Sequence, residues 1–290
     1  MEIRNIQRTG NMHYLYLPTS WCRDHKITSK SKISLEENSD GSLVVSPHIT
    51  EKKPKHLKFN VSENDDEVLH KLVVACYINP VSSFEINFDK EMDITRLLHQ
   101  KRIISLESVE IDKNQITCHG SISTSDPESM LRTMTKKIKN MIKVMQNSYD
   151  KELIARYEDE IDRSKMLIDK SIISSLTFER TTKIKTIDLY YISLISKDLE
   201  RLTDQLIRVD HKESEFLDLV YGAVDQLQSI IENSSAISHK AAIQFIKKVG
   251  KISPFEVKDV KSYDRERIRL SLTTISEVVT DWAITKEVEK

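Results

Sequence analysis

The chain has 290 residues, of which 39% are hydrophobic and 31% charged, and its formal net charge is −1 at pH 7. These values exclude a disordered chain and indicate a soluble protein of two or three domains. A nearly neutral chain attracts nucleic acid only where basic residues cluster locally. Three widely spaced cysteines fit a reducing compartment, and neither a signal peptide nor a membrane-spanning apolar run is evident. We therefore expect a cytoplasmic protein without membrane insertion.

Residues 1–50 are predicted to form short strands, one short helix and a hairpin. Over residues 12–17, Met12, Tyr14 and Tyr16 alternate with His13, Leu15 and Leu17. This period of two is typical of a strand. One or two helical turns are expected over residues 20–25. Asp40 and Gly41 predict a hairpin turn, because both central residues of a type I′ turn need positive φ.

A segment of this length is too short to bury a core of its own. We therefore expect it to pair with a second copy of itself in a homodimer. Tyr14, Tyr16 and Trp21 could form a platform on which nucleic-acid bases stack. The core of a dimer accounts for them better.

Basic residues are concentrated in the same segment. Arg4 and Arg8 are an even number of positions apart, so we expect them to share one face of an extended strand. With Arg23 and Lys26 beyond the turn, they form the predicted DNA-binding set. Such side chains can contact phosphates and reach base edges. The alternative interpretation is a charged strand facing solvent.

The order of these residues resembles a known module. Arg4, Gln7, Thr9 and Gly10 are followed by a tyrosine-rich strand, by Leu17-Pro18 and by Trp21. The pattern is similar to the looped-hinge, swapped-hairpin DNA-binding domain of the AbrB/SpoVT family, in the version fused to archaeal PhoU-type proteins. The resemblance implies a swapped-hairpin β-barrel with a looped-hinge helix over residues 1–50, which dimerises and binds double-stranded DNA.

Residues 55–122 alternate between strand and helix patterns, after a linker at residues 47–54. The order βαβαββ predicts a small α/β sandwich. No glycine-rich phosphate loop and no cluster of catalytic side chains is evident, so a structural or ligand-sensing role is expected. The expected elements are strands at 57–61, 84–88, 109–111 and 116–118, a helix at 65–77, and a second helix marked by Ile94, Leu97 and Leu98.

Residues 126–290 are predicted to be helical, beginning at Asp126-Pro127. Apolar residues recur at steps of three and four or of seven, which is typical of helix-bundle seams. We expect a three-helix bundle and then a second, less regular unit with helices at 214–232, 237–249 and 262–285. The seams are Leu131, Met134, Ile138, Met141 and Met145; Ile154, Ile161 and Ile168; and Ile192, Ile195, Leu199, Leu202, Leu206 and Val209.

Two acidic pairs lie within the first bundle. Glu158 and Asp162 are four residues apart on one predicted helix, and Glu200 and Asp204 have the same spacing on the next. Like charges at this spacing share a face and repel each other. A divalent or iron cation (Mg²⁺, Ca²⁺, Zn²⁺ or iron) between the helices would relieve that repulsion. The alternative is ordinary solvent-exposed acids.

The residues Leu199-Glu200-Arg201-Leu202-Thr203-Asp204 are similar to the Leu-Glu-Arg-Ile-Gly-Asp signature of the PhoU family, and Glu158 to Asp162 matches its second acidic motif. The resemblance covers residues 126–212 and implies repeated three-helix bundles that bind metal and act in phosphate-uptake control. The second repeat is degenerate, because Thr273 stands at an acidic position of the signature.

We hypothesise a homodimeric, DNA-binding regulator of phosphate uptake and not an enzyme. Its helical domain would sense a metal, phosphate status or a partner. A second hypothesis is an adaptor that binds a phosphate-transporter ATPase or a sensor kinase, with the N-terminal segment serving dimerisation alone. A di-metal hydrolase is the third hypothesis, but no Glu-x-x-His ligand motif accompanies the acidic pairs.

Overall fold

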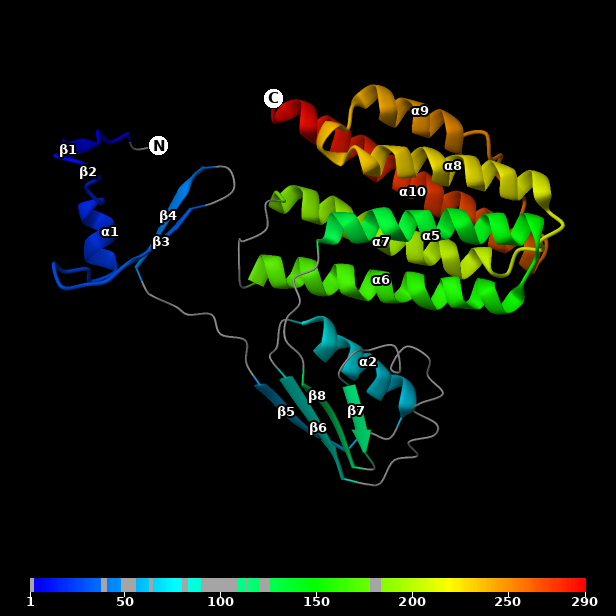
Figure 1. The fold of residues 1–290 in the computed structure, drawn as a ribbon, viewed down its shortest axis with the longest axis horizontal. Helices are drawn as coiled ribbons and strands as arrows, with labels where there is room; N and C mark the ends of the chain where they lie inside the picture. The colour runs from blue at the N-terminus through cyan, green and yellow to red at the C-terminus, as the bar shows by residue number, and fades with distance from the viewer. Residues whose placement is uncertain are drawn as a thin grey trace. The chain divides into compact units, whose positions relative to one another are not determined.

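The computed structural model describes residues 3–37, 41–47, 56–62, 65–79, 83–89, 109–112, 114–119, 126–177 and 184–290. Contacts divide the chain into two compact units, Met1–Lys53 and Pro54–Lys290. The predicted order, a β-rich beginning followed by a mostly helical C-terminal part, is confirmed (Figure 1). Each unit is described by itself.

The N-terminal unit contains two separate antiparallel sheets of two strands each. Gly10 and Gly41 have φ values of +62° and +80° in the two connections, a conformation that glycine adopts without steric cost. Within the described residues of one chain these sheets do not close into a barrel. The elements are β1 (Gln7–Thr9), β2 (Met12–Tyr14), α1 (Thr19–Asp24), β3 (Ser34–Glu37) and β4 (Leu43–Ser46).

Two expectations for this unit need correction. Strand β1 begins at Gln7, so Arg4 precedes the strand and does not share a strand face with Arg8. Strand β2 ends at Tyr14, earlier than the alternating pattern predicts. The predicted hairpin at Gly41 is confirmed, whereas Asp40 and residues 48–54 of the predicted linker lie outside the described residues.

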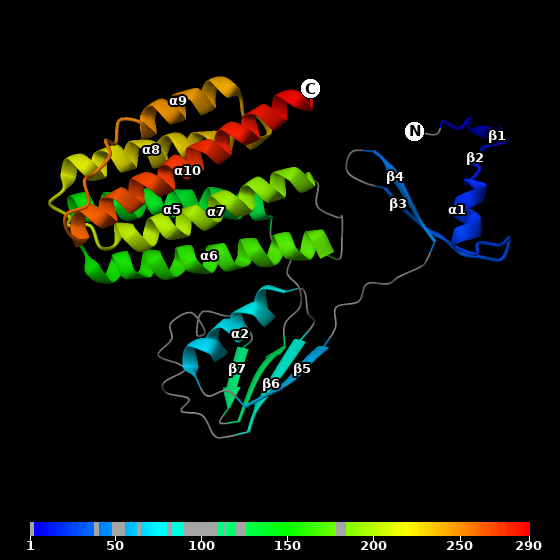
Figure 2. The same ribbon diagram turned by 180° about the vertical axis from the view of Figure 1, so that it is seen from behind.

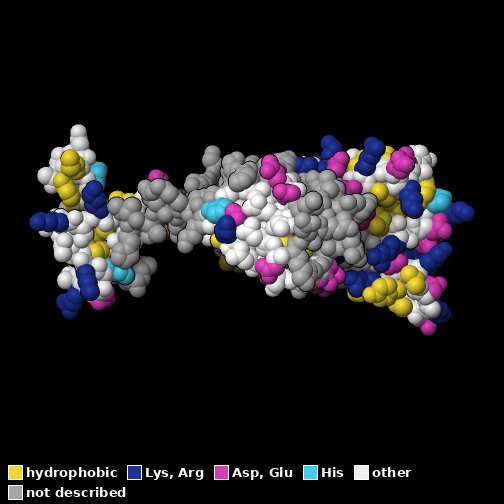
Figure 3. Space-filling model, turned by 90° about the horizontal axis from the view of Figure 1, so that it is seen from below, with side chains coloured by type: hydrophobic (Ala, Val, Ile, Leu, Met, Phe, Trp, Pro, Cys, Tyr) yellow, Lys and Arg dark blue, Asp and Glu magenta, His cyan; other side chains and the backbone are white. Residues whose placement is uncertain are grey.

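None of the described residues of the N-terminal unit is buried. Large apolar side chains instead lie at its surface, where hydrophobic and basic groups occur together (left of Figure 3). Leu15 and Tyr16 are 54% and 61% exposed. Most of the apolar area of this unit therefore contributes nothing to folding in a single chain. The other large exposed apolar residues are Ile3, Ile6, Met12, Tyr14, Leu35 and Leu43.

The second unit begins with a four-stranded sheet in the order β5-β6-β8-β7, in which β5 and β6 are parallel and the other pairs antiparallel. Phe59 pairs with Ile86, and Ile86 pairs with Ile116 across the sheet. The predicted second helix at Ile94, Leu97 and Leu98 lies outside the described residues. The elements are β5 (His56–Val61), α2 (Asp66–Ile78), β6 (Ser83–Phe88), β7 (Val109–Asp112) and β8 (Gln115–His119).

Helix α2 covers one face of this sheet. The carboxylate of Asp65 accepts hydrogen bonds from the backbone N–H groups of Glu67 and Val68, which fixes where the helix starts. Leu69 and Val73 are fully buried in the core that α2 shares with the sheet. Cys76 and Cys118 lie in this core as well, where burial raises the pKa of both thiols and keeps them neutral.

The remaining helices form two three-helix groups. In the first, α5 (Pro127–Asn147), α6 (Lys151–Thr177) and α7 (Thr186–Leu206) pack together. In the second, α9 (His239–Val249) packs against both α8 (Ser214–Glu232) and α10 (Val260–Val288). Contacts of α5 with α8 and of α7 with α10 join the groups into one bundle (Figure 2).

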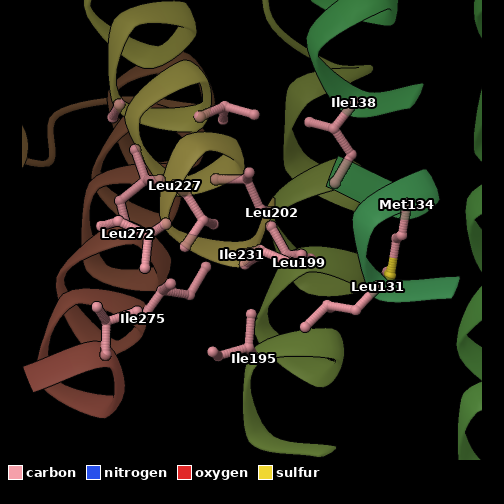
Figure 4. Close-up of a cluster of buried hydrophobic side chains, with 14 of the residues drawn as sticks. Leu131, Met134, Ile138, Ile195, Leu199, Leu202, Leu227, Ile231, Leu272 and Ile275 are labelled. Carbon is pink, nitrogen blue, oxygen red and sulfur yellow. The ribbon is translucent and has the colours of Figure 1, made fainter. Parts of the chain in front are cut away.

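The predicted seams form the core of this bundle. Every seam residue named from the sequence is buried, and Leu199 and Leu202 of α7 lie between α5 and the second group (Figure 4). Side-chain caps start several of the helices, including Ser238 at α9 and a reciprocal capping box of Asp259 and Ser262 at α10. Among the helices in the described part of the chain, none combines the length and apolar character needed to cross a membrane.

Helix α2 also packs against α6 of the bundle, and both ribbon views place it between the sheet and α6 (Figures 1 and 2). Met166 of α6 is buried within the core of the α/β domain. The Lys170 ammonium lies 4.1 Å from the centre of the Tyr77 ring, a cation–π contact. The α/β domain and the bundle are therefore in direct side-chain contact.

Candidate functional site

The first candidate site is the basic surface of the N-terminal unit, where Arg8 is carried by the β1–β2 hairpin. The Arg8 backbone pairs with His13, and the Arg8 Nε–H donates to the Gly10 carbonyl at 2.9 Å. This bond ties the guanidinium to the turn. Within the described residues Arg8 has no acidic partner, so its charge faces solvent.

The other predicted DNA contacts differ in how they are held. Arg23 lies in the last turn of α1, and Lys26 follows that helix; both side chains are exposed. Neither has an acidic partner among the described residues. Arg4 is also exposed, in the irregular segment before β1. The structure thus places all four residues at the surface of one unit, on four different stretches of backbone.

Lys26 has an unusual backbone conformation. Its φ is +53°, and it is the one non-glycine residue with a positive φ in the described part of the chain. The Ile27 N–H donates to the Cys22 carbonyl at 2.8 Å, and the Lys26 N–H donates to the Arg23 carbonyl at 3.1 Å. This bond pair is the Schellman helix end, at which glycine is the usual left-handed residue. A lysine there costs about 1–2 kcal/mol.

The second candidate site is an acidic cluster between two helices of the bundle. Carboxylate oxygens of Asp162 from α6 and of Glu200 and Asp204 from α7 all lie within 4.8 Å of one another. Asp162 is buried and the other two are half-buried. Three carboxylates are a donor set that suits a hard divalent cation. The residues present therefore fit a cation between α6 and α7.

The sequence of α7 accounts for this placement. Leu199 and Leu202 are fully buried in the bundle core, which fixes the rotation of α7. Glu200 and Asp204, four residues apart, then share another face of the helix and meet α6. Two unit charges at this separation repel by roughly 3–4 kcal/mol at an effective dielectric constant of about 20. A bound cation would convert that repulsion into attraction.

The fourth predicted ligand does not join the group. Glu158 lies on α6, one turn before Asp162, and is half-buried, but it is not among the clustered carboxylates. Glu277 and Asp281 on α10 are exposed. In the part of the chain that the structure describes, the triad is the one group of three or more such ligands.

A cavity of about 420 Å³ reaches the acidic cluster from the α/β domain. Asp162 and Glu200 form part of its wall, and His70 of α2 forms another part. Val74 and Met166 add apolar surface. The sequence did not predict that α2 brings His70 to this cavity wall, because no spacing in the chain indicates that α2 packs on α6.

Comparison with known proteins gives no further guide to either site: no protein-family model, no curated protein and no solved structure matches the chain. The resemblance to the AbrB/SpoVT and PhoU families therefore rests on the sequence motifs.

Proposed function

We propose that the protein is a dimeric, DNA-binding transcription regulator whose helical unit carries a cation-responsive site. By its resemblance to PhoU proteins, the process that it regulates is phosphate uptake. The observation that carries the proposal is the surface of the N-terminal unit, which combines exposed apolar residues with the exposed side chains of Arg8, Arg23 and Lys26, none of which has an acidic partner among the described residues.

The apolar residues support dimerisation. A unit in which no described residue is buried gains little from the hydrophobic effect as a single chain. A second copy that covers Leu15, Tyr16 and Leu35 would supply the missing core. Two-fold pairing would also double the positive charge of the surface, because each copy brings Arg4, Arg8, Arg23 and Lys26.

The conformation of Lys26 supports a role in binding. Glycine would adopt this conformation at the end of α1 without strain, so folding alone does not account for a lysine at φ +53°. A long cationic side chain that can reach a DNA phosphate is such a reason. Stability and binding should then respond in opposite directions when the residue is changed.

The direct test is a titration of the full chain with a short DNA duplex at about 50 and 200 mM salt. Affinity should fall steeply, because each phosphate contact contributes about −0.9 to the slope of log K against log salt concentration. In Arg8→Ala, which removes one contact from each copy of a dimer, the slope should shrink by about 2. An unchanged slope in Arg8→Ala would remove that residue from the interface.

A matched control removes basic residues outside the N-terminal unit. Lys240 and Lys247 are exposed on α9, so the double alanine variant should bind DNA as the wild type does. An equal loss of affinity in this control and in Arg8→Ala would indicate attraction by overall charge rather than by a defined surface.

The substitution Lys26→Gly separates binding from folding. It should stabilise the N-terminal unit by about 1 kcal/mol, because it relieves the left-handed strain, and should at the same time weaken DNA binding. Hydrogen exchange of α1 amides reports the first effect and the duplex titration the second. If both stability and DNA affinity rise, Lys26 is not a DNA contact.

The adaptor hypothesis predicts a different result. The N-terminal unit would dimerise, but no duplex binding would be seen even at low salt. The purified chain would instead form a complex with a transporter ATPase or a sensor kinase.

A further inference from the structure

A second cavity lies within the helical bundle, at the start of α8. Its volume is about 660 Å³, which is within the range of small-molecule sites in proteins. Its wall is built from the start of α8, from residues that follow α9 and from Arg265 of α10. None of the residues predicted to bind DNA or a cation lines this cavity.

Part of the cavity wall is aromatic. The rings of Phe216 and Phe255 lie edge to face, with their centroids 5.5 Å apart. Phe216 is buried, whereas Phe255 is half-buried and keeps part of its surface accessible. Leu219 and Ile252 add aliphatic surface. A flat apolar group fits such a wall, because aromatic rings pack well edge to face or offset.

The first turn of α8 is open at the cavity. The helix begins at Ser214 without a side-chain cap, so its first backbone N–H groups have neither an intrahelical nor a side-chain acceptor. Ser214, Glu215 and Phe216 of this turn all line the cavity. A helix N-terminus favours an anion, because its N–H groups and its dipole both present positive charge.

Two lysines add positive charge to the same cavity. Lys212 lies two residues before the first turn of α8, and Lys251 follows the end of α9. Both are exposed, and among the described residues neither forms an ion pair. Ammonium groups and open N–H groups therefore line one cavity, and both kinds of donor bind the oxygens of an anion.

Arg265 accounts for the open helix end. Its guanidinium lies 3.1 Å from Glu213 Oε2, and this ion pair holds the carboxylate that precedes α8 without capping it. Arg265 Nε is buried and donates no hydrogen bond within the described residues, a state that an acceptor on a ligand would relieve. Glu215 is the other carboxylate of the wall. The two lysines exceed it, so the remaining charge is positive.

We propose that this cavity binds a mononucleotide, with its phosphate at the N-terminus of α8 beside Lys212 and Lys251. The base then packs against the aromatic wall, because any base can stack on an aromatic ring. Ser214 and Ser253, which also line the cavity, supply hydroxyl groups for the ribose. The inference goes beyond the DNA-binding and cation sites of the proposed function and does not depend on them.

The test is isothermal titration calorimetry of the full chain with the four ribonucleoside monophosphates, with adenosine and with inorganic phosphate. At least one monophosphate should bind with a Kd below about 1 mM. Adenosine and inorganic phosphate should each bind at least about tenfold more weakly, because each keeps only one part of the contacts. Failure of all four monophosphates to bind, or equal affinity for inorganic phosphate, would overturn the proposal.

Substitutions test the two parts of the wall separately. Lys251→Ala should weaken nucleotide binding about tenfold, because it removes a charge-assisted hydrogen bond, and Lys251→Arg should keep most of the affinity. Phe255→Leu should weaken nucleotide binding about fivefold and leave the affinity for inorganic phosphate unchanged. The matched control is Lys247→Ala, at an exposed lysine of α9 outside the cavity wall, which should bind as the wild type does.

Hydrogen exchange locates the bound nucleotide. In the wild type, nucleotide should slow exchange at the start of α8 and leave residues 7–14 of the N-terminal unit unchanged. The same measurement on the free Lys251→Ala protein checks that α8 and α9 stay folded. A folded Lys251→Ala protein with wild-type affinity, or protection confined to the N-terminal unit, would overturn the nucleotide site and leave the DNA-binding proposal intact.

Discussion

The helical bundle and the N-terminal unit handle apolar residues in opposite ways. Leu202 of α7 has no exposed surface, whereas Leu15 of the N-terminal unit is 54% exposed. The bundle therefore completes its core within one chain. The N-terminal unit leaves its apolar side chains at the surface, and in the proposed dimer a second copy would cover them.

We expect the largest loss of stability from a substitution in the bundle core. Leu202→Ala should lower the free energy of unfolding by about 2–5 kcal/mol, through lost burial and the cavity that remains. Urea denaturation followed by circular dichroism measures this loss. The loss should be the same at low and high protein concentration, because the core lies within one chain. A loss below about 1 kcal/mol would mean that the site collapses around the smaller side chain.

The N-terminal unit should respond to concentration instead. In Leu15→Ser, burial of the exposed half of the side chain would be lost from both copies of the proposed dimer. We expect a loss of about 2–3 kcal/mol per dimer, or roughly a hundredfold weaker association. Sedimentation equilibrium measures the dissociation constant. Leu270→Ser, at an apolar residue exposed on α10, is the control and should leave association unchanged.

A charged contact in the second helical group also stabilises the bundle within one chain. Glu266 accepts two hydrogen bonds from the Arg269 guanidinium, at 2.9 and 2.6 Å, and one from the Phe255 N–H. The Arg269 bonds hold the pKa of Glu266 below its ordinary value of 4.5. Glu266→Gln should cost about 1–2 kcal/mol at neutral pH.

The sign of the pH dependence follows from the lowered pKa. The stabilisation by Glu266 is complete above the pKa of the unfolded chain and is lost as the pH falls through the lower pKa of the folded chain. The stability difference between wild type and Glu266→Gln should therefore narrow below about pH 4.5. Urea denaturation at pH 7 and pH 3.5 measures it; a difference that widens in acid would contradict this account.

The smallest expected effect is at a helix cap. Ser238 Oγ accepts the Ala241 N–H at 3.3 Å and starts α9. Ser238→Ala should cost about 0.5–1 kcal/mol, again independent of protein concentration. Ser253→Ala, at an exposed serine outside the helices, should have no measurable effect on thermal unfolding. Equal effects of the two variants would show that the cap adds nothing.

The helical bundle could be predicted from the sequence because its apolar residues repeat at helical spacing over long segments, and helix-breaking residues separate those segments. Helix α8 runs over the predicted residues, and α10 extends the prediction by a few residues at each end. Of the predicted ligands, Asp162, Glu200 and Asp204 come together because the buried seam fixes how α7 faces α6. Glu158 is four residues from Asp162, as Glu200 is from Asp204, but its carboxylate does not join the cluster.

Other features depend on tertiary packing that no local pattern encodes. Arg4 and Arg8 have strand spacing, yet β1 is too short to include both. The left-handed backbone at Lys26 was not predicted, because a lysine gives no signal for positive φ. The place of His70 in the wall of the cavity depends on how α2 docks on α6, a contact between distant parts of the sequence.

The central claim is that the N-terminal unit completes its core with a second chain. Sedimentation equilibrium of the full wild-type chain, over micromolar to sub-micromolar concentrations, tests it directly. We predict twice the mass of one chain, falling to the mass of one chain on dilution. Hydrogen exchange of residues 7–14 should rise in parallel. The mass of one chain at every concentration, with those amides still protected, would contradict the account.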